Sequence, residues 1–211
     1  PALSLRGVSK HFGGVRAVNN VTTDIAYGER RLFIGTNGAG KTTLFNLIAG
    51  DLPVSTGSIQ LFGKDVTNMP TRKRVKLGMR RTYQTSALFD GLTVRQNFYL
   101  ALLGEKKTGS HLNMLVHHRG NPGFEEKIQE TAKTVGLEAK LDEDVSALSH
   151  GERRQLEFGL AIITDPQMLL FDEPAAGLSA EERKMMLQMI QSLSRDITIV
   201  MIEHDIDLAF A

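Results

Sequence analysis

Glycine, lysine and threonine recur in residues 35–42 at the spacing of a phosphate-binding loop, because the letters GTNGAGKT fit G-x-x-x-x-G-K-[ST] without a gap. The glycines let the backbone turn tightly and aim N–H groups at an anion, which a following helix N-terminus also attracts. Lys41 would neutralise phosphate oxygens, and the Thr42 hydroxyl would ligate Mg²⁺. The alternative is a turn that binds nothing, and chance alone gives this pattern in about one chain in a hundred. The stretch predicts nucleotide binding by Asn37, Gly38, Ala39, Gly40, Lys41, Thr42 and Thr43.

Two adjacent carboxylates, Asp172 and Glu173, follow the continuous apolar run of residues 167–171. Such a run is typical of a central parallel strand, and active groups gather at the carboxyl ends of parallel strands. Asp172 would then bind Mg²⁺ through water, and Glu173 could polarise an attacking water. A strand that merely ends in acidic turn residues is the alternative, which the phosphate-binding loop disfavours.

A second helix start with free backbone donors is predicted at Ser149 and Gly151, before an amphipathic helix that runs to Ile163. Ser149 can cap this helix, and the N–H groups at its start could meet a phosphate. The alternative is an ordinary N-cap with no ligand.

Phe12 and His204 are two further candidates for contacts with a nucleotide. Phe12 stands beside two glycines upstream of the phosphate-binding loop, where it could stack on an adenine ring or cap the edge of the core. His204 follows the apolar run 197–202, where it could touch a γ-phosphate or the attacking water, or lie on a surface loop.

Alternating and apolar segments predict the elements that position these residues. Residues 3–9 and 21–25 alternate as half-buried antiparallel strands do, and residues 32–34 predict a short buried strand before the loop. A helix is expected over residues 42–49, stopped by Gly50. A hairpin strand (58–62), a short basic helix (71–77) and a strand (79–83) that ends at Gln84 follow. The basic helix is expected to present a solvated face of Arg72, Lys73, Arg74 and Lys76.

Helical patterns are expected in several segments after Thr93, between the loop and strand segments. Capping boxes pair Thr93 with Gln96 and Ser179 with Glu182, and a helix is expected over residues 124–135. The loop 85–92 carries Leu88, Phe89 and Leu92, which either enter the core or form an apolar surface. The loop 104–123 carries three histidines, for which solvated side chains are a better interpretation than a metal site.

Composition limits the remaining classes. With 211 residues, one P-loop domain with an inserted helical piece is expected. A formal net charge of +1 gives no field for general nucleic-acid binding, so no nucleic-acid partner is expected. The chain has no cysteine, which excludes disulfides and suits a cytosolic protein. No signal peptide or membrane-length apolar run is visible, and the chain stops at Ala211 in an apparent helix start, so we expect the C-terminal end of the domain to be missing.

Taken together and in this order, the motifs resemble the nucleotide-binding domain of ABC transporters over essentially the whole chain. The landmarks are Phe12, residues 35–42, Gln84, residues 148–152, residues 171–173, residues 176–179 and His204. The resemblance implies an α/β P-loop NTPase fold with a parallel core sheet, an N-terminal antiparallel β subdomain and a helical subdomain inserted at 93–163 of a single domain, 1–211.

The resemblance also implies a role for each site residue, with ATP and Mg²⁺ as the ligands. Phe12 stacks on adenine, Gln84 senses the γ-phosphate and contacts the metal through water, Glu173 is the catalytic base and His204 is the switch histidine. Ser149 and Gly151 complete the site of a second, head-to-tail domain, either identical or paralogous, so that ATP is sandwiched between two domains.

Within the family, residues 81–85 and 172–178 resemble the ATP-binding subunits of branched-chain amino-acid importers, including relatives that handle urea or amides. Three positions depart from the common pattern: residues 148–152 read LSHGE where LSGGQ is usual, Ser179 replaces Asp, and Phe12 replaces Tyr. The expected partners are membrane permease subunits, docked near residues 84–92, and indirectly a solute-binding protein. The expected place is peripheral, on the cytoplasmic face of the inner or plasma membrane.

Three other classes fit the sequence less well. DNA-repair ATPases carry a long coiled coil between the two nucleotide motifs, and ribosome-associated ATPases carry two domains in tandem with basic linkers, neither of which is found here. A catalytically silent paralogue would not need Lys41, Asp172, Glu173 and His204 together. A GTPase would carry an N-K-x-D motif, which the sequence lacks.

Overall fold

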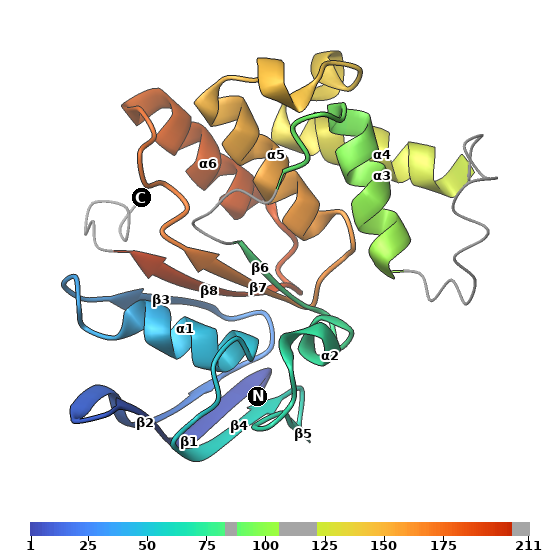
Figure 1. Cartoon of the computed structure of the whole chain (residues 1–211). Helices are drawn as coiled ribbons and strands as arrows, with labels where there is room; N and C mark the ends of the chain where they lie inside the picture. The colour runs from blue at the N-terminus through green and yellow to red at the C-terminus, as the bar shows by residue number, and fades with distance from the viewer. Residues whose placement is uncertain (83–87, 106–121, 204–211) are drawn as a thin grey trace. The chain divides into compact units, whose positions relative to one another are not determined.

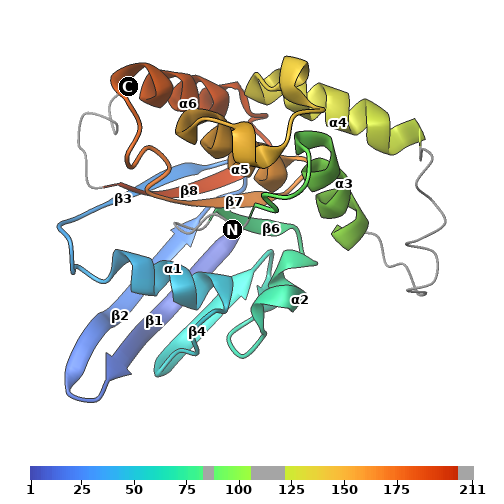
Figure 2. The same ribbon diagram turned by 45° about the horizontal axis from the view of Figure 1, so that its top comes forward.

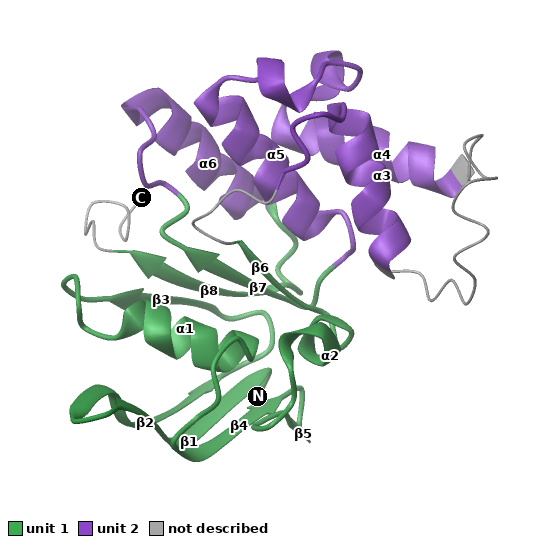
Figure 3. Ribbon diagram, viewed as in Figure 1, with its two compact units in different colours: residues 1–84, 166–174, 193–211 green, residues 85–165, 175–192 purple. Residues whose placement is uncertain are grey.

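The computed structural model describes residues 1–82, 88–105 and 122–203. The chain divides into two compact units (Figure 3): unit 1 comprises residues 1–84, 166–174 and 193–211, and unit 2 comprises residues 85–165 and 175–192. Gln84 and His204, two of the residues expected at the site, lie outside the described residues.

Unit 1 contains an antiparallel sheet with the strand order β2-β1-β4-β5 (Figure 1). Its strands are β1 (Leu3–Phe12), β2 (Val15–Ile25), β4 (Thr56–Leu61) and β5 (Lys64–Asp65). The first two are longer than the segments 3–9 and 21–25 expected from alternation. The β1–β2 pairing shifts register at several places after Leu5, and such irregularities interrupt the alternation of buried and exposed side chains on which the sequence prediction relied.

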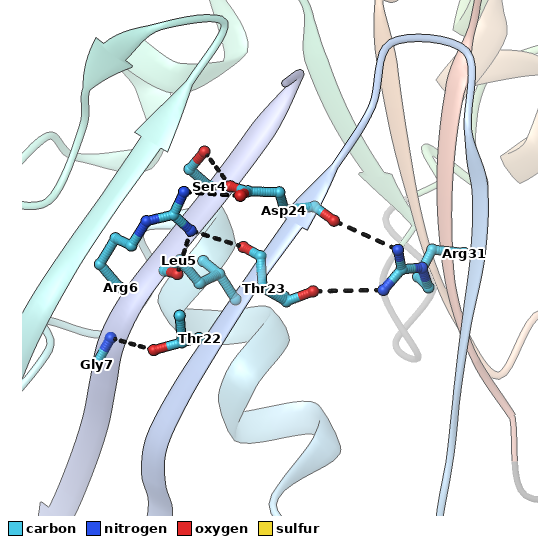
Figure 4. A network of polar contacts seen from close by, with 8 residues as sticks. All are labelled: Ser4, Leu5, Arg6, Gly7, Thr22, Thr23, Asp24 and Arg31. Carbon is cyan, nitrogen blue, oxygen red and sulfur yellow. Dashed lines mark hydrogen bonds and ion pairs between the residues drawn. The ribbon is translucent and has the colours of Figure 1, made fainter.

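Polar contacts connect β1, β2 and β3 (Arg30–Ile34), a strand of the second sheet (Figure 4). Arg6 donates to Asp24 at 2.7 Å and the Ser4 hydroxyl donates to Asp24 at 2.6 Å. These contacts, that of Arg6 first, lower the pKa of Asp24. Arg31 donates to the Thr23 hydroxyl and to the Asp24 carbonyl, both at 3.3 Å, and so ties the next strand to β2.

A parallel sheet with the order β3-β8-β7-β6 forms the second layer of unit 1. Its strands are β3 (Arg30–Ile34), β6 (Met79–Thr82), β7 (Met168–Asp172) and β8 (Thr198–Glu203). The register pairs Ile34 with Glu203 and Asp172 with Ile202, so three strands end at one edge of the sheet. This edge is where the phosphate-binding loop and the acidic pair begin.

The strand predicted at residues 32–34 is present, but the prediction that it is buried is wrong. Ile34 is 50% exposed, and Leu32 and Phe33 are only partly buried. The physical reason is position, because β3 is an edge strand of the sheet and, among the described strands, pairs only with β8. β7, which has a neighbour on each side, is buried along its whole length.

Helix α1 (Lys41–Ala49) lies between the two sheets of unit 1 (Figures 1 and 2). Its buried residues Leu44, Phe45, Leu47 and Ile48 belong to one apolar cluster with residues of both sheets. Gly50 ends the helix in the left-handed conformation with φ 85°, as the sequence predicts. The core therefore fixes the helix that follows the phosphate-binding loop.

Arg74 corrects the prediction of a solvated basic face on helix α2 (Thr71–Val75), because its side chain is only 1% exposed. Its guanidinium donates to the carbonyls of Leu47 at 2.8 Å and Ile48 at 2.7 Å, in the last turn of α1. It also donates to the carbonyls of Met69 and Thr67. The last carbonyls of a helix lack intrahelical partners, so they can accept hydrogen bonds from a buried cation.

Unit 2 is helical. Its elements are α3 (Val94–Glu105), α4 (Pro122–Val135), the 3-10 helices η2 (Glu138–Lys140) and η3 (Val145–Ala147), α5 (His150–Ile162) and α6 (Ala180–Ser192). The predicted capping boxes are confirmed at Thr93 with Gln96 and at Ser179 with Glu182. Within the described ranges, no helix has both the length and the apolar character that a membrane crossing requires.

Candidate functional site

Unit 1 contains a pocket of about 400 Å³ beside the start of α1. Residues 37–43 of the phosphate-binding loop line it together with Ala17 of β2 and Glu173, which follows β7. Seven predicted nucleotide-binding residues and the predicted catalytic base therefore border one cavity. Its volume lies within the range of small-molecule sites.

The glycines of the loop are required by its geometry. Gly38 and Gly40 have φ angles of 82° and 85°, which disfavour any side chain. A Cβ atom at Gly40 would also lie 2.0 Å from the carbonyl oxygen of Ala17. Gly40 is the N-cap of α1, and it provides no side-chain cap, while the first turn of α1 holds no acidic residue. The helix start can therefore accept an anion from outside the chain.

Lys41 lies at the first position of α1 and lines the pocket. Its ammonium donates to the Thr36 carbonyl at 3.0 Å and also to the Gly35 carbonyl. Two loop carbonyls thus hold the cation beside the loop whose N–H groups would bind phosphate. Thr42, the predicted metal ligand at the next position, is exposed.

Asp172 lies at the end of β7 and is nearly buried, together with Arg81 of β6. Arg81 donates a hydrogen bond to Oδ2 of Asp172 at 2.8 Å. The side chain of Arg81 is 5% exposed and that of Asp172 is 1% exposed. Burial raises the pKa of Asp172, and the hydrogen bond from Arg81 opposes that rise. The Oδ1 atom is buried and has no hydrogen-bond partner in the described part of the chain.

The donors present fit a magnesium ion. Mg²⁺ prefers oxygen ligands and is commonly held by one or two carboxylates, phosphate oxygens and water. A buried carboxylate oxygen without a partner, Oδ1 of Asp172, is of the required type, and the Thr42 hydroxyl at the start of α1 is a second candidate. The residues therefore suit the group that the phosphate-binding loop implies.

Glu173 has a backbone conformation that is unusual for a residue with a side chain. Its φ is 52°, in the left-handed region, and its N–H donates to the Ile202 carbonyl of β8 at 3.0 Å. Such a conformation costs about 1–3 kcal/mol and is commonly found at functional sites. The turn places the side chain of Glu173 at the pocket, while Asp172 before it stays buried.

Phe12 lies at the end of β1, opposite Val15 across the β1–β2 hairpin, and is 48% exposed. The Lys10 ammonium lies 5.3 Å from the centre of its ring. Phe12 is not among the residues that line the pocket. Its stacking on adenine therefore stays a prediction.

Ser149 and Gly151 lie at the start of α5 in unit 2. Ser149 forms a capping box with Glu152: its hydroxyl accepts from the Glu152 N–H at 3.3 Å, and its own N–H donates to the Glu152 carboxylate at 2.8 Å. A Cβ atom at Gly151 would lie 2.1 Å from Oε1 of Glu182, a residue of α6. Hydrogen bonds from Ser179 and Gly151 lower the pKa of Glu182, and the bond from the Ser179 N–H has the largest effect. The prediction of free backbone donors at this helix start is therefore wrong, because Glu152 accepts from the Ser149 N–H and Glu182 from the Gly151 N–H.

Sequence reasoning missed Arg81 and Ala17 as parts of this region. Ala17 has no distinctive side chain, so only the close approach of its carbonyl to Gly40 reveals it. Arg81 did carry a signal, because an arginine within a predicted strand needs a polar partner when it is buried. The sequence did not show which strand would lie beside it, and the structure identifies that partner as Asp172 at the end of β7.

The chain is similar to known families and proteins over most of its length. The ABC transporter family matches residues 18–176. The high-affinity branched-chain amino acid transport ATP-binding protein LivG of Salmonella typhimurium is 34% identical over 213 residues, which cover 99% of this chain and 84% of that protein. The corresponding protein BraF of Pseudomonas aeruginosa is 31% identical and covers 100% of this chain and 85% of its own length.

Solved structures have the same fold. The ADP conformation of MJ1267, an ATP-binding cassette of an ABC transporter, aligns with a TM-score of 0.82 at 30% identity, over 99% of this chain and 83% of that one. The dimeric post-hydrolysis state of the ATP-binding cassette MJ0796, bound to ADP and Pi, aligns with a TM-score of 0.82 at 22% identity, over 98% of this chain and 90% of that one. Both likenesses extend over both units.

Proposed function

Since the chain belongs to the ABC transporter family, we propose that it is the ATP-binding and ATP-hydrolysing subunit that energises an importer of branched-chain or related amino acids. The observation that carries the proposal is the pocket in which residues 37–43 and Glu173 meet. In a host strain that lacks the chain, uptake of radiolabelled leucine should fall and should return with the wild-type gene. Unchanged uptake of leucine, isoleucine and valine would contradict the importer assignment.

Residues that line the pocket and one buried residue beside Glu173 each have a part in hydrolysis. Lys41 and the N–H groups of residues 37–43, which line the pocket, hold the phosphates. Thr42 of the pocket and the buried Asp172 are the residues that would hold Mg²⁺. The ion, when bound, neutralises charge on the β- and γ-phosphate oxygens. Glu173 is the base that accepts a proton from the attacking water, and Gln84 and His204 are proposed to sense the γ-phosphate.

Phe12 is proposed as the adenine-stacking residue. Replacing it by alanine should weaken the binding of ATP far more than the binding of inorganic triphosphate. Stacking acts on the base alone and is worth about 1–3 kcal/mol per base in nucleic-acid complexes. Titration calorimetry with the two ligands measures the difference. Val15→Ala is the matched control, because Val15 is an exposed apolar residue opposite Phe12 on the same hairpin. Equal losses of both ligands in Phe12→Ala would remove Phe12 from the base site.

The second domain of the ATP sandwich is proposed to be another copy of this chain or a paralogue. Ser149 and Gly151 would donate to the γ-phosphate bound by that opposing domain. Ser149 is exposed, which supports this role, but Gly151 is buried and its N–H donates to Glu182, so that donor would have to exchange Glu182 for the phosphate. We also propose a single domain in which residues 93–163 form the helical insert.

The loop after residue 87 is proposed to dock a membrane permease, which would place the chain peripherally on the cytoplasmic face of the membrane. Phe89 is 58% exposed, yet its backbone is fixed by the buried side chain of Asn97. Asn97 accepts from the Phe89 N–H at 3.0 Å and donates to the Phe89 carbonyl at 3.2 Å. An exposed aromatic side chain on a backbone held in this way is suited to act as an interface anchor. A solute-binding protein would contact the permease rather than this chain.

Replacing Phe89 by serine should uncouple transport while the melting temperature stays within about 2 °C of the wild-type value, because a side chain that is mostly in solvent contributes little to folding. Leucine uptake in cells and thermal unfolding of the purified chain are the two measurements. Met185→Ser, which changes another exposed apolar residue of unit 2, should leave uptake unchanged. A large drop in melting temperature for Phe89→Ser would place Phe89 in the core instead.

A further inference from the structure

We propose that Arg81 is a positioning residue for the metal-binding carboxylate: it holds Oδ2 of Asp172 and leaves Oδ1 as the acceptor for Mg²⁺ or a metal-bound water. The inference rests on the proposed function, in which Asp172 is a metal ligand. Arg81 itself would touch neither the nucleotide nor the ion.

The guanidinium of Arg81 is fixed by contacts from several elements of unit 1. It donates to Asp172 Oδ2 at 2.8 Å, to Asn46 Oδ1 at 2.6 Å and to Asp51 Oδ2 at 3.1 Å. It also lies over the ring of Phe45, 5.8 Å from the ring centre. These contacts join the end of β7 to α1 and to Asp51, the residue that follows Gly50. They hold the guanidinium of Arg81 in one position.

A guanidinium held in one position determines how the carboxylate of Asp172 is oriented. β6 and β7 are neighbouring parallel strands, and Arg81 is paired with Leu170, two residues before Asp172. Because Oδ2 is held at that distance and the side chain is 1% exposed, the carboxylate has little freedom to rotate. The two carboxylate oxygens of Asp172 are therefore not equivalent. Oδ2 accepts a hydrogen bond from the Arg81 guanidinium, and Oδ1 is available to the metal ion or to its water.

The buried oxygen is the observation that points to a ligand. Buried polar atoms almost always have a hydrogen-bond partner, and a charged oxygen without one is costly. Oδ1 of Asp172 has none among the residues that the structure describes. A metal ion or the water that it orders would satisfy this atom, and Arg81 would direct the carboxylate toward it.

Arginine has properties at this position that lysine lacks. Its planar group donates in several fixed directions at once, whereas lysine presents one compact ammonium. Arg81→Lys keeps the positive charge but cannot reach Asp172, Asn46 and Asp51 together. Asp51→Asn is a matched control, because it removes the outer ion pair, whose carboxylate is 29% exposed, and leaves the contact with Asp172 in place.

The experiment compares nucleotide binding with and without metal in the full chain. ADP affinity is measured by titration calorimetry in excess Mg²⁺ and in EDTA, and Mn²⁺ binding to the ADP complex is measured by electron paramagnetic resonance. For Arg81→Lys we expect Mn²⁺ binding to weaken about tenfold or more, the size of effect found for residues that orient metal ligands. ADP affinity in EDTA should stay within about twofold of wild type, and Asp51→Asn should match wild type in both assays.

Other outcomes would overturn the inference. Unchanged Mn²⁺ binding in Arg81→Lys would show that Arg81 does not position the ligand. Equal losses in EDTA and in Mg²⁺, or the same losses in Asp51→Asn, would assign Arg81 a purely structural role. A wild-type chain that binds ADP with no metal dependence would instead reject Asp172 as a metal ligand, which is a failure of the proposed function. Arg81→Lys keeps the buried charge of Asp172 compensated, so it is preferred to a neutral variant that could unfold.

Discussion

Replacing Lys41 by alanine abolishes ATP binding at ordinary concentrations: this is the first of the two largest effects that we expect. Among the described residues that line the pocket, Lys41 is the only one with a cationic side chain. Each charge-assisted hydrogen bond contributes about 1.5–3 kcal/mol, so losing contacts to two phosphate groups should weaken binding by about a hundredfold or more. Titration calorimetry with Mg-ATP measures the change.

A matched control separates this local loss from a general loss of positive charge. Lys73→Ala removes the same charge from the exposed side of α2 and should leave ATP affinity within about twofold of wild type, since exposed charges act weakly at a distance. Thermal unfolding should show that Lys41→Ala still folds, because the hydrogen bonds it loses are to loop carbonyls. Unchanged ATP affinity in Lys41→Ala would refute the assignment of the phosphate-binding loop.

The second large effect is expected for Glu173→Gln, which should nearly stop hydrolysis while ATP still binds. Glutamine keeps the shape of the side chain and its hydrogen-bonding capacity but cannot accept a proton from water. A general base contributes about 10²–10⁴ in rate, so turnover of Mg-ATP should fall by about that factor. Phosphate release measured beside ATP affinity separates the two steps.

The same variant tests whether ATP is bound between two domains. If Ser149 and Gly151 donate to the γ-phosphate of an opposing domain, intact ATP joins the two domains, and Glu173→Gln should accumulate as an ATP-dependent dimer. Light scattering should show this dimer with Mg-ATP and a monomer with Mg-ADP, with a paralogue added where one exists. A variant that binds ATP and stays monomeric would contradict the sandwich mechanism.

Local patterns were sufficient to predict many elements of the fold from the sequence. The helix after the phosphate-binding loop, the buried strand before Asp172 and the capping boxes at Thr93 and Ser179 are confirmed. Each depends on residues close in the chain: a periodic apolar pattern, a glycine in the left-handed region, or a serine or threonine three residues before Glu or Gln. The α/β P-loop fold implied by the motifs is confirmed as well.

Features that depend on distant segments could not be predicted in this way. Residues 32–34 read as a buried strand, but their burial depends on the strand order, which makes β3 an edge. Arg74 was assigned to a solvated charge run, whereas its real partners are carbonyls about 26 residues earlier in the chain. The left-handed φ of Glu173 likewise occurs together with a hydrogen bond to Ile202, a residue of a strand far along the chain. Such long-range constraints leave no periodic pattern in the sequence.

The two ends of α1 differ in whether the chain itself provides hydrogen-bond partners for the terminal backbone groups. This difference links the stability of the fold to nucleotide binding. Arg74 satisfies carbonyls at the C-terminal end, while the N-terminal end has neither the serine nor the glutamate that closes α5 and α6. A bound phosphate would supply the missing anion, so the ligand acts as part of the helix. Because a ligand at a hundred times its Kd stabilises the native state by about 2.7 kcal/mol, the free energy of unfolding should rise with the concentration of nucleotide.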